Sequence, residues 1–152
     1  MKRLIGIVLA TVIGVSLVPR GADAAEPDTD ILELMLHGVT AVYSSTVMAM
    51  NAYRSGLLTK EEANAEIARN KAFLAVLLRC ATSLERSSAP DEYDDISFAK
   101  DFGQVCSYLE FALDSFSTFV AEGDEIDRRL FDRYLFKGEQ TMNRLLKEFS
   151  GE

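Results

Sequence analysis

Long stretches in which apolar residues recur at helical spacing dominate this chain from about residue 29 onward. Breaks marked by glycine or proline separate these stretches near Gly56, Pro90 and Gly123. No sustained two-residue alternation occurs, and the chain lacks the Asn-Gly and Asp-Gly dipeptides that signal tight hairpins. Short connections force neighbouring helices to run in opposite directions. The sequence therefore predicts an all-α, antiparallel, up-down-up-down four-helix bundle.

Local signals set the expected ends of these helices. Gly56 can adopt the left-handed conformation that ends a helix, and Thr59 with Glu62 fits a capping box that starts the next one. The stretch 87–95 is the longest break, and Gly138 lies inside the last helical stretch, where it is expected to loosen the helix. The predicted helices cover residues 29–54, 59–84, 96–120 and 124–149.

The first residues have the three parts of a secretory signal peptide. Lys2 and Arg3 precede a mostly apolar run, and the run leads to the small-residue triplet Ala22-Asp23-Ala24. The run is shorter than the roughly 20 residues that a stable membrane span needs. We therefore expect cleavage near Ala24, with residues 1–24 as signal peptide and 25–152 as one four-helix domain in the periplasm or secreted.

The chain is acidic, and this limits the partners it can attract. Its formal net charge is −8, and losing a signal with three basic residues and one acid makes the mature charge −10. A field of this sign repels phosphate backbones, which argues against nucleic-acid binding. It also opposes electrostatic adsorption to anionic membranes.

Both cysteines, Cys80 and Cys106, lie in the predicted mature domain. An even number of cysteines in an oxidising compartment favours a bridge. In an antiparallel pair joined near residue 91, the two sulfurs fall within about one helical turn of the same level. The sequence therefore predicts a Cys80–Cys106 disulfide. The alternative is that both are small buried apolar side chains that never pair.

Residue counts exclude several kinds of catalytic and metal sites. The chain has one histidine, His37, which removes di-iron sites and His-Glu-x-x-His peptidases. It has no Cys-x-x-Cys-His motif for covalent haem and no Gly-x-Ser-x-Gly elbow. The acidic clusters 91–95 and 124–127 lack the spacing of an EF-hand loop. We therefore expect a protein that is not an enzyme and has no metal or cofactor.

A b-type haem or another small ligand in the bundle interior is the alternative to this expectation. His37 and Met48 lie about 16 Å apart along one helix, too far to ligate one iron. Met142 is better placed, because the last helix should run antiparallel to the first and bring it near the level of His37. The helical wheel opposes this pair, since His37 lies far from the centre of the apolar stripe.

Residues 34–53 form a run of 20 positions without Asp, Glu, Lys or Arg. One side of the expected helix is a stripe of large apolar residues, typical of a bundle core. The opposite side is small and uncharged where a solvent-facing helix would carry charges, and weakly charged faces are typical of interfaces. This opposite side comprises Leu34, His37, Gly38, Ala41, Ser44, Ser45, Met48 and Ala52. The residues of the candidate interface are Leu34, Ala41, Ser45, Met48 and Ala52.

Two interpretations of this face are open at this point. Either another part of the chain covers it, for instance the 87–95 stretch, or a homodimer or partner helix docks there. A membrane span is disfavoured because about a third of the segment is polar or glycine. The sequence thus predicts an exported, acidic binding or protein-interaction module without catalytic activity, and the ligand or haem carrier is the alternative.

Overall fold

The computed structural model describes residues 29–87 and 93–150, and this part of the chain is all-α, with four helices and no strand. The helices are α1 (Thr29–Arg54), α2 (Lys60–Ser87), α3 (Tyr93–Glu122) and α4 (Glu125–Ser150). The prediction of four helices is confirmed. The second helix extends three residues beyond its expected end, and the third begins three residues before its expected start. The predicted signal peptide and most of the 87–95 break lie outside the described residues.

The turns between helices form as the local sequence predicts. Gly56 and Gly123 both have positive φ, at 70° and 75°, a conformation that side chains with a Cβ rarely adopt. The capping box is present: the Thr59 amide donates to the Glu62 carboxylate at 2.9 Å, and the Glu62 amide donates to the Thr59 hydroxyl at 3.2 Å. The Asp124 carboxylate accepts from the backbone amide of Ile126 at 2.8 Å, which caps α4.

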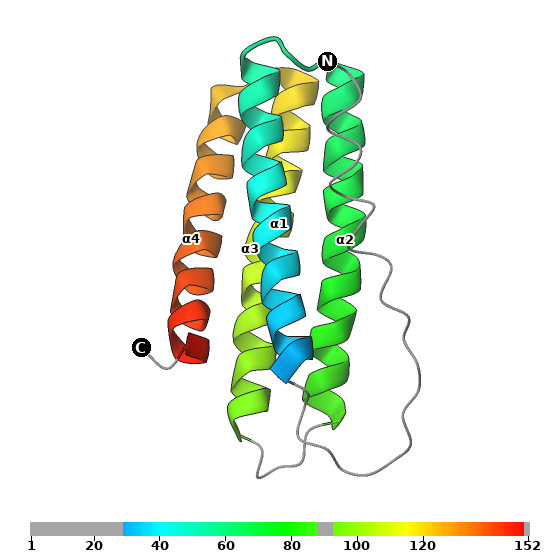
Figure 1. Ribbon diagram of the computed structural model, residues 1–152. Helices are drawn as coiled ribbons and strands as arrows, with labels where there is room; N and C mark the ends of the chain where they lie inside the picture. The colour runs from blue at the N-terminus through cyan, green and yellow to red at the C-terminus, as the bar shows by residue number, and fades with distance from the viewer. Residues whose placement is uncertain (1–28, 88–92, 151–152) are drawn as a thin grey trace.

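Consecutive helices lie side by side (Figure 1). α3 packs closely against both α2 and α4, whereas α1 packs mainly against α2 and more loosely against α3 and α4. Across α3 and α4 the contacting residue numbers rise on one helix and fall on the other, so the two helices are antiparallel. The pairs are Asp101–Arg144, Tyr108–Lys137 and Phe111–Tyr134. α1 and α2 show the same relation, through the pairs Gly38–Leu77 and Thr46–Asn70.

Gly138 lies inside α4, which runs through it without a break; whether it loosens the helix locally stays a prediction. It is buried against α3, where an added Cβ would lie 3.5 Å from the Tyr108 Cβ and 3.6 Å from a Leu109 methyl. The small residue brings the backbone of α4 close to the side chains of α3. These are ordinary contact distances, so the packing against α3 leaves room for a Cβ at this position.

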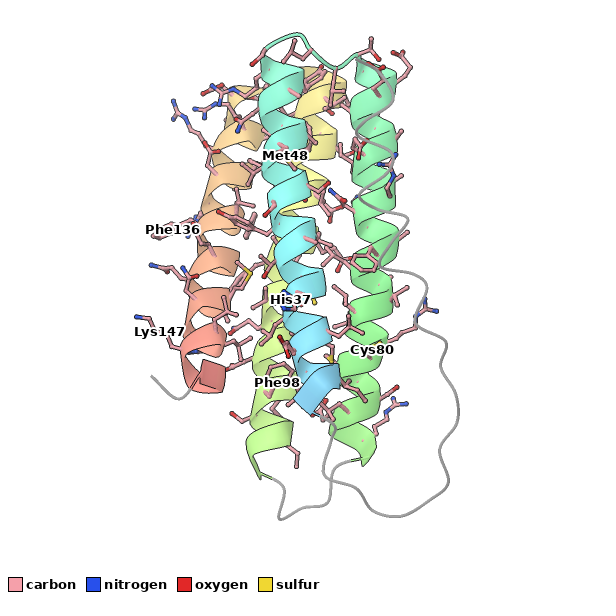
Figure 2. All side chains as sticks on the ribbon, in the orientation of Figure 1. His37, Met48, Cys80, Phe98, Phe136 and Lys147 are labelled. Carbon is pink, nitrogen blue, oxygen red and sulfur yellow. The ribbon has the colours of Figure 1, made fainter. Side chains whose placement is uncertain are left out.

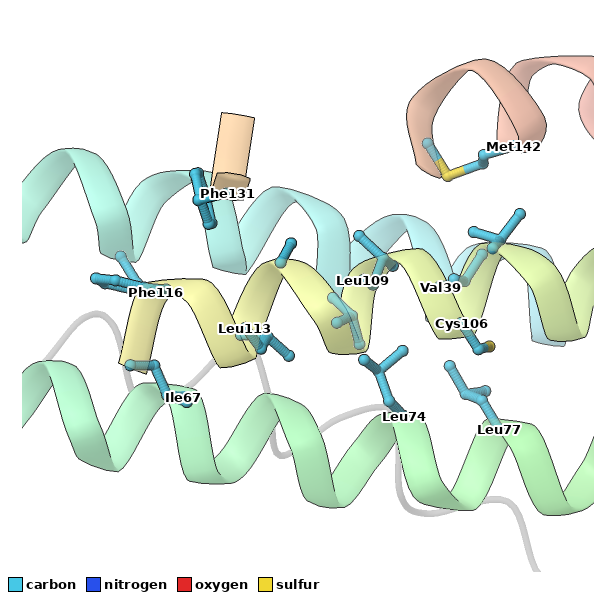
Figure 3. Close-up of a cluster of buried hydrophobic side chains, with 14 of the residues drawn as sticks. Val39, Ile67, Leu74, Leu77, Cys106, Leu109, Leu113, Phe116, Phe131 and Met142 are labelled. Atoms are coloured by element: carbon cyan, nitrogen blue, oxygen red, sulfur yellow. The ribbon is translucent and has the colours of Figure 1, made fainter. Parts of the chain in front are cut away.

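The core is continuous and draws on all four helices (Figure 3). α3 contributes most of the side chains that have no solvent exposure, which are Phe102, Val105, Leu109, Ala112, Leu113 and Phe116. The buried polar side chains include Thr46 and Asn70, which bond to each other across α1 and α2 at 3.1 Å. A buried polar group is stable only when its hydrogen bonds are made, and this pair meets that requirement.

Candidate functional site

The inward stripe of α1 is buried as the helical wheel predicts. Its large members pack into the common core, with Tyr43 partly buried at the edge. The Tyr43 hydroxyl of α1 lies near the Glu139 carboxylate of α4. Burial and this carboxylate raise the pKa of Tyr43. The fully or nearly buried members are Met35, Leu36, Val39, Val42, Thr46 and Met50.

The opposite side of α1 is open to solvent at its large apolar residues. Leu34 is 50% exposed and Met48 is 65% exposed, and Ala41 between them is also exposed. Ser45 and Ala52 are half-buried. Figure 2 places Met48 and His37 along α1, where this helix crosses α3 in the view. We refer to Leu34, Ala41, Ser45, Met48 and Ala52 as the outer face of α1.

One residue assigned to that side by the helical wheel lies elsewhere. Gly38 is buried, and a Cβ built on it would lie only 3.0 Å from a Leu77 methyl of α2. The wheel assumes one inward direction, but α1 is buried both toward the common core and toward α2. Gly38 allows α2 to approach, and it is therefore a packing residue and not part of the outer face.

The outer face has no cover among the residues that the structure describes, as the exposure of Leu34 and Met48 shows. Most of the 87–95 stretch, the cover considered from the sequence, lies outside these residues. By length and composition alone, Ile31–Arg54 also meets the criteria for a membrane-spanning helix, a test that core helices of soluble proteins pass as well. One side of this helix packs in the bundle core, and 33% of the apolar window is buried there.

The structure does not bring His37 and Met142 together in the interior. His37 is exposed, and its imidazole Nε2 lies 3.4 Å from the Glu33 carboxylate, one turn earlier on the same helix. Met142 is buried, and its sulfur lies 3.5 Å from the hydroxyl of Thr40. Met142 is thus near the level of His37 on the adjacent helix, but the imidazole faces solvent. These two side chains do not form a pair of axial ligands.

The two cysteines are free thiols in the structure, with Cys80 exposed and Cys106 buried. Figure 3 shows Cys106 beside Leu77 in the packing between α2 and α3. Burial raises the pKa of Cys106 to about 12, so its nucleophilic thiolate form is scarce at neutral pH. The structure does not show the predicted Cys80–Cys106 bridge, which stays a prediction.

Polar side chains in the described residues do not gather into a metal site. No group of three or more His, Cys, Asp or Glu side chains there is arranged to hold a metal ion. Each described buried side-chain nitrogen or oxygen has a hydrogen-bond partner, so none is left over for a ligand. Of the two acidic clusters, the one at 124–127 caps α4 through Asp124, and the side chains of the one at 91–95 lie outside those that the structure describes.

Sequence reasoning missed a second unusual surface, on α4. Arg129, Arg133 and Lys137 follow one another at intervals of four residues, and the aromatic ring of Phe136 beside them is 57% exposed. The signal was available in the sequence as three cations with helical spacing in an acidic chain. It was masked because α4 carries many charges of both signs, which is usual for a solvated helix face.

Comparison with protein-family models, with curated proteins and with solved structures finds no match for this chain.

Proposed function

We propose that this chain is an exported protein-interaction module without catalytic activity, which binds through the outer face of α1. In this proposal the signal peptide is cleaved near Ala24, and residues 25–152 form an up-down-up-down four-helix bundle in the periplasm or outside the cell. The signal-like N-terminus and the antiparallel contacts between neighbouring helices support this assignment. The occupant of the outer face is a second copy of the chain or a partner helix.

The exposure of Met48 and Leu34 on a helix face without charge carries the proposal. Fully burying an aliphatic side chain of this size is favourable by about 1.5–3 kcal/mol. Because Leu34 is 50% exposed and Met48 is 65% exposed, docking gains on the order of 1 kcal/mol from each of them. Ala41 lies between them and lets a partner backbone come close, so both anchors can be covered by one helix.

The absence of charge on this face suits association between acidic molecules. Two cleaved copies, each with a formal charge of −10, repel each other over most of their surfaces. Contact through residues 34–53 brings no carboxylates of that segment together, since the segment has none. In an isologous dimer the same surface of each copy forms the interface, so the outer face of α1 would form both halves of the contact.

Native mass spectrometry of protein purified from the exporting compartment tests this proposal. We expect an assembly, and we expect Met48→Glu or Ala41→Arg to disrupt it while the helical circular dichroism and the Tm stay close to those of the parent. Val76→Glu is the matched control, because Val76 is also exposed but lies on α2. If Met48→Glu unfolds the monomer, the face belongs to the core and the proposal is lost; an intact assembly in both α1 variants refutes it equally.

A small-ligand or haem carrier is not favoured by any contact in the described residues. The side chains that would hold an iron point to different surroundings, with His37 in solvent and Met142 against Thr40. The interior between the helices is filled by the continuous core. The interaction module is therefore the function that the geometry supports best.

A further inference from the structure

α4 carries a row of cations on successive turns that repel one another. Arg129, Arg133 and Lys137 are four residues apart, which places neighbouring side chains about 6 Å apart on one side of the helix. Arg129 and Arg133 are exposed, and the half-buried Lys137 lies with its ammonium 5.6 Å from the ring centroid of Tyr108. Like charges at this spacing destabilise a helix. We refer to these three residues as the cationic row of α4.

The same helix pairs its other arginines with carboxylates. Arg128 bonds to Glu125 and, at 2.6 Å, to Asp132. Arg144 bonds to Asp101 of α3 at 2.8 Å. In the described part of the chain Arg133 takes part in no ion pair, and its neighbours one turn before and after are both cations. Arg129 lies close enough to Glu125 to help Arg128 lower the pKa of that carboxyl, and Lys137 lies over the Tyr108 ring. The unbalanced charge of the row is therefore at Arg133, in a chain that has an excess of acids.

An exposed aromatic ring adjoins the row. Phe136 is 57% exposed, and Figure 2 shows Phe136 and Lys147 on the side of α4 that faces away from the other helices. Arginine and exposed aromatic residues are the types enriched at protein interfaces. Side chains whose arrangement lowers the stability of the fold are expected at functional sites.

We propose that the cationic row of α4, together with Phe136, docks an acidic helix of a partner protein. Carboxylates spaced three or four residues apart on such a helix match the spacing of the row and would remove its internal repulsion. An apolar residue between the carboxylates would cover the ring of Phe136. This surface lies on a different helix from the outer face of α1, so the two proposals stand or fall separately.

The shape and surroundings of the row favour a helix over a membrane or a second copy. The row is narrow, and the carboxylate of Asp132 lies beside it, so a flat anionic membrane would also meet the acids of a chain with a net charge of −8. A second copy would have to supply carboxylates at matching intervals. No helix in the described residues carries three of them four residues apart in succession.

Fluorescence anisotropy with a labelled peptide helix tests the proposal. The probe has glutamates at three positions four residues apart and a leucine between them, and its twin has glutamine at those positions. At low salt we expect the glutamate peptide to bind at least about tenfold more tightly than its twin, with the preference falling at about 0.15 M salt. Arg133→Glu should abolish the preference, and Arg133→Gln should reduce it.

The Tm of the same variants provides a second, independent readout. Arg133→Glu replaces two repulsive pairs on α4 with two attractive ones, so we expect the Tm to rise by about 3–8 °C while binding is lost. Lys100→Glu changes the net charge by the same amount at an exposed site on α3 and should leave peptide binding unchanged. A binding loss accompanied by a lower Tm would mean that Arg133 is structural, which overturns the proposal.

Three further outcomes would also overturn it. Equal binding of the glutamate and glutamine peptides would show that the row does not recognise carboxylates. Binding to vesicles of phosphatidylglycerol and phosphatidylcholine that is lost in Arg133→Glu, without a peptide preference, would assign the row to a membrane surface. Dimerisation that is lost in Arg133→Glu but unaffected by Met48→Glu would assign it to a second copy.

Discussion

Removing the buried hydrogen bond between Thr46 and Asn70 is expected to destabilise the fold only when one partner is left behind. The Thr46 hydroxyl has no solvent exposure, and Asn70 is nearly as buried. Leaving either group without its partner costs about 1–3 kcal/mol. For a domain of this size 1 kcal/mol corresponds to a Tm change of about 4 °C. We therefore expect Asn70→Ala and Thr46→Val each to lower the Tm by about 4–12 °C.

The double variant Thr46→Val with Asn70→Leu removes both polar groups together. Replacing a buried polar pair with apolar groups of similar shape is nearly neutral or stabilising, so we expect its free energy of unfolding to lie within about 1 kcal/mol of the parent. Urea unfolding followed by circular dichroism completes the double-mutant cycle. If the double variant loses as much stability as the two single variants together, the pair makes no coupled contribution and the reasoning fails.

The same double variant tests a link between this pair and the outer face of α1. α1 is apolar on its inward stripe and also at Leu34 and Met48, so the hydrophobic effect alone distinguishes poorly between rotations of the helix about its axis. The bond to Asn70 fixes one rotation, as single buried polar residues fix register in coiled coils. We expect the double variant to stay folded but to show broadened amide resonances along α1, and sharp resonances there would refute the link.

Three further predictions concern other contacts. If the Cys80–Cys106 bridge forms, unreduced and denatured protein from the exporting compartment should show no free thiol. In reduced native protein the exposed Cys80 should react quickly with a thiol reagent. Cys106 should react only as the pH approaches its raised pKa of about 12. Gly138→Ala should raise stability by about 0.5–1 kcal/mol, because the added Cβ meets α3 at ordinary contact distance, whereas Gly138→Leu should force the two helices apart and lower the Tm. The hydrogen bond from Arg128 lowers the pKa of Glu125 in the folded state. The contribution of Glu125 to stability should therefore be present above its unfolded pKa and lost as the pH falls through its lower folded pKa. The Tm values of Glu125→Gln and the parent should differ near neutral pH and converge in acid.

The helices and their ends could be predicted from the sequence because the determining interactions are local. Thr59 and Glu62 contact each other three residues apart, and Gly56 and Gly123 adopt a conformation that glycine favours on its own. The buried stripe of α1 followed equally from a single helix, since periodicity fixes which residues can share one side. These features need no knowledge of the neighbouring helices.

The sequence predicted the candidate site only in part, because the remainder depends on how helices pack. Leu34 and Met48 were placed correctly on the outer face, but Gly38 was not, since its burial depends on where Leu77 of α2 lies. The cationic row can be recognised in the sequence, but whether each arginine on α4 forms an ion pair depends on how the helices pack. Arg144 finds its carboxylate on α3, through a contact distant in sequence, and Arg133 has no ion pair in the described part of the chain.

The contrast between α1 and α3 supports the proposal that a partner covers the outer face of α1. A helix that is apolar on most sides is normally surrounded by its own fold. α3 fits this rule, since it packs closely against two neighbours and keeps charges such as Glu110 on its remaining side. α1 has no charge between Glu33 and Arg54, yet it packs closely only against α2. The core of a single chain leaves Leu34 and Met48 of α1 exposed to water, and the docked helix that we propose would cover this apolar surface.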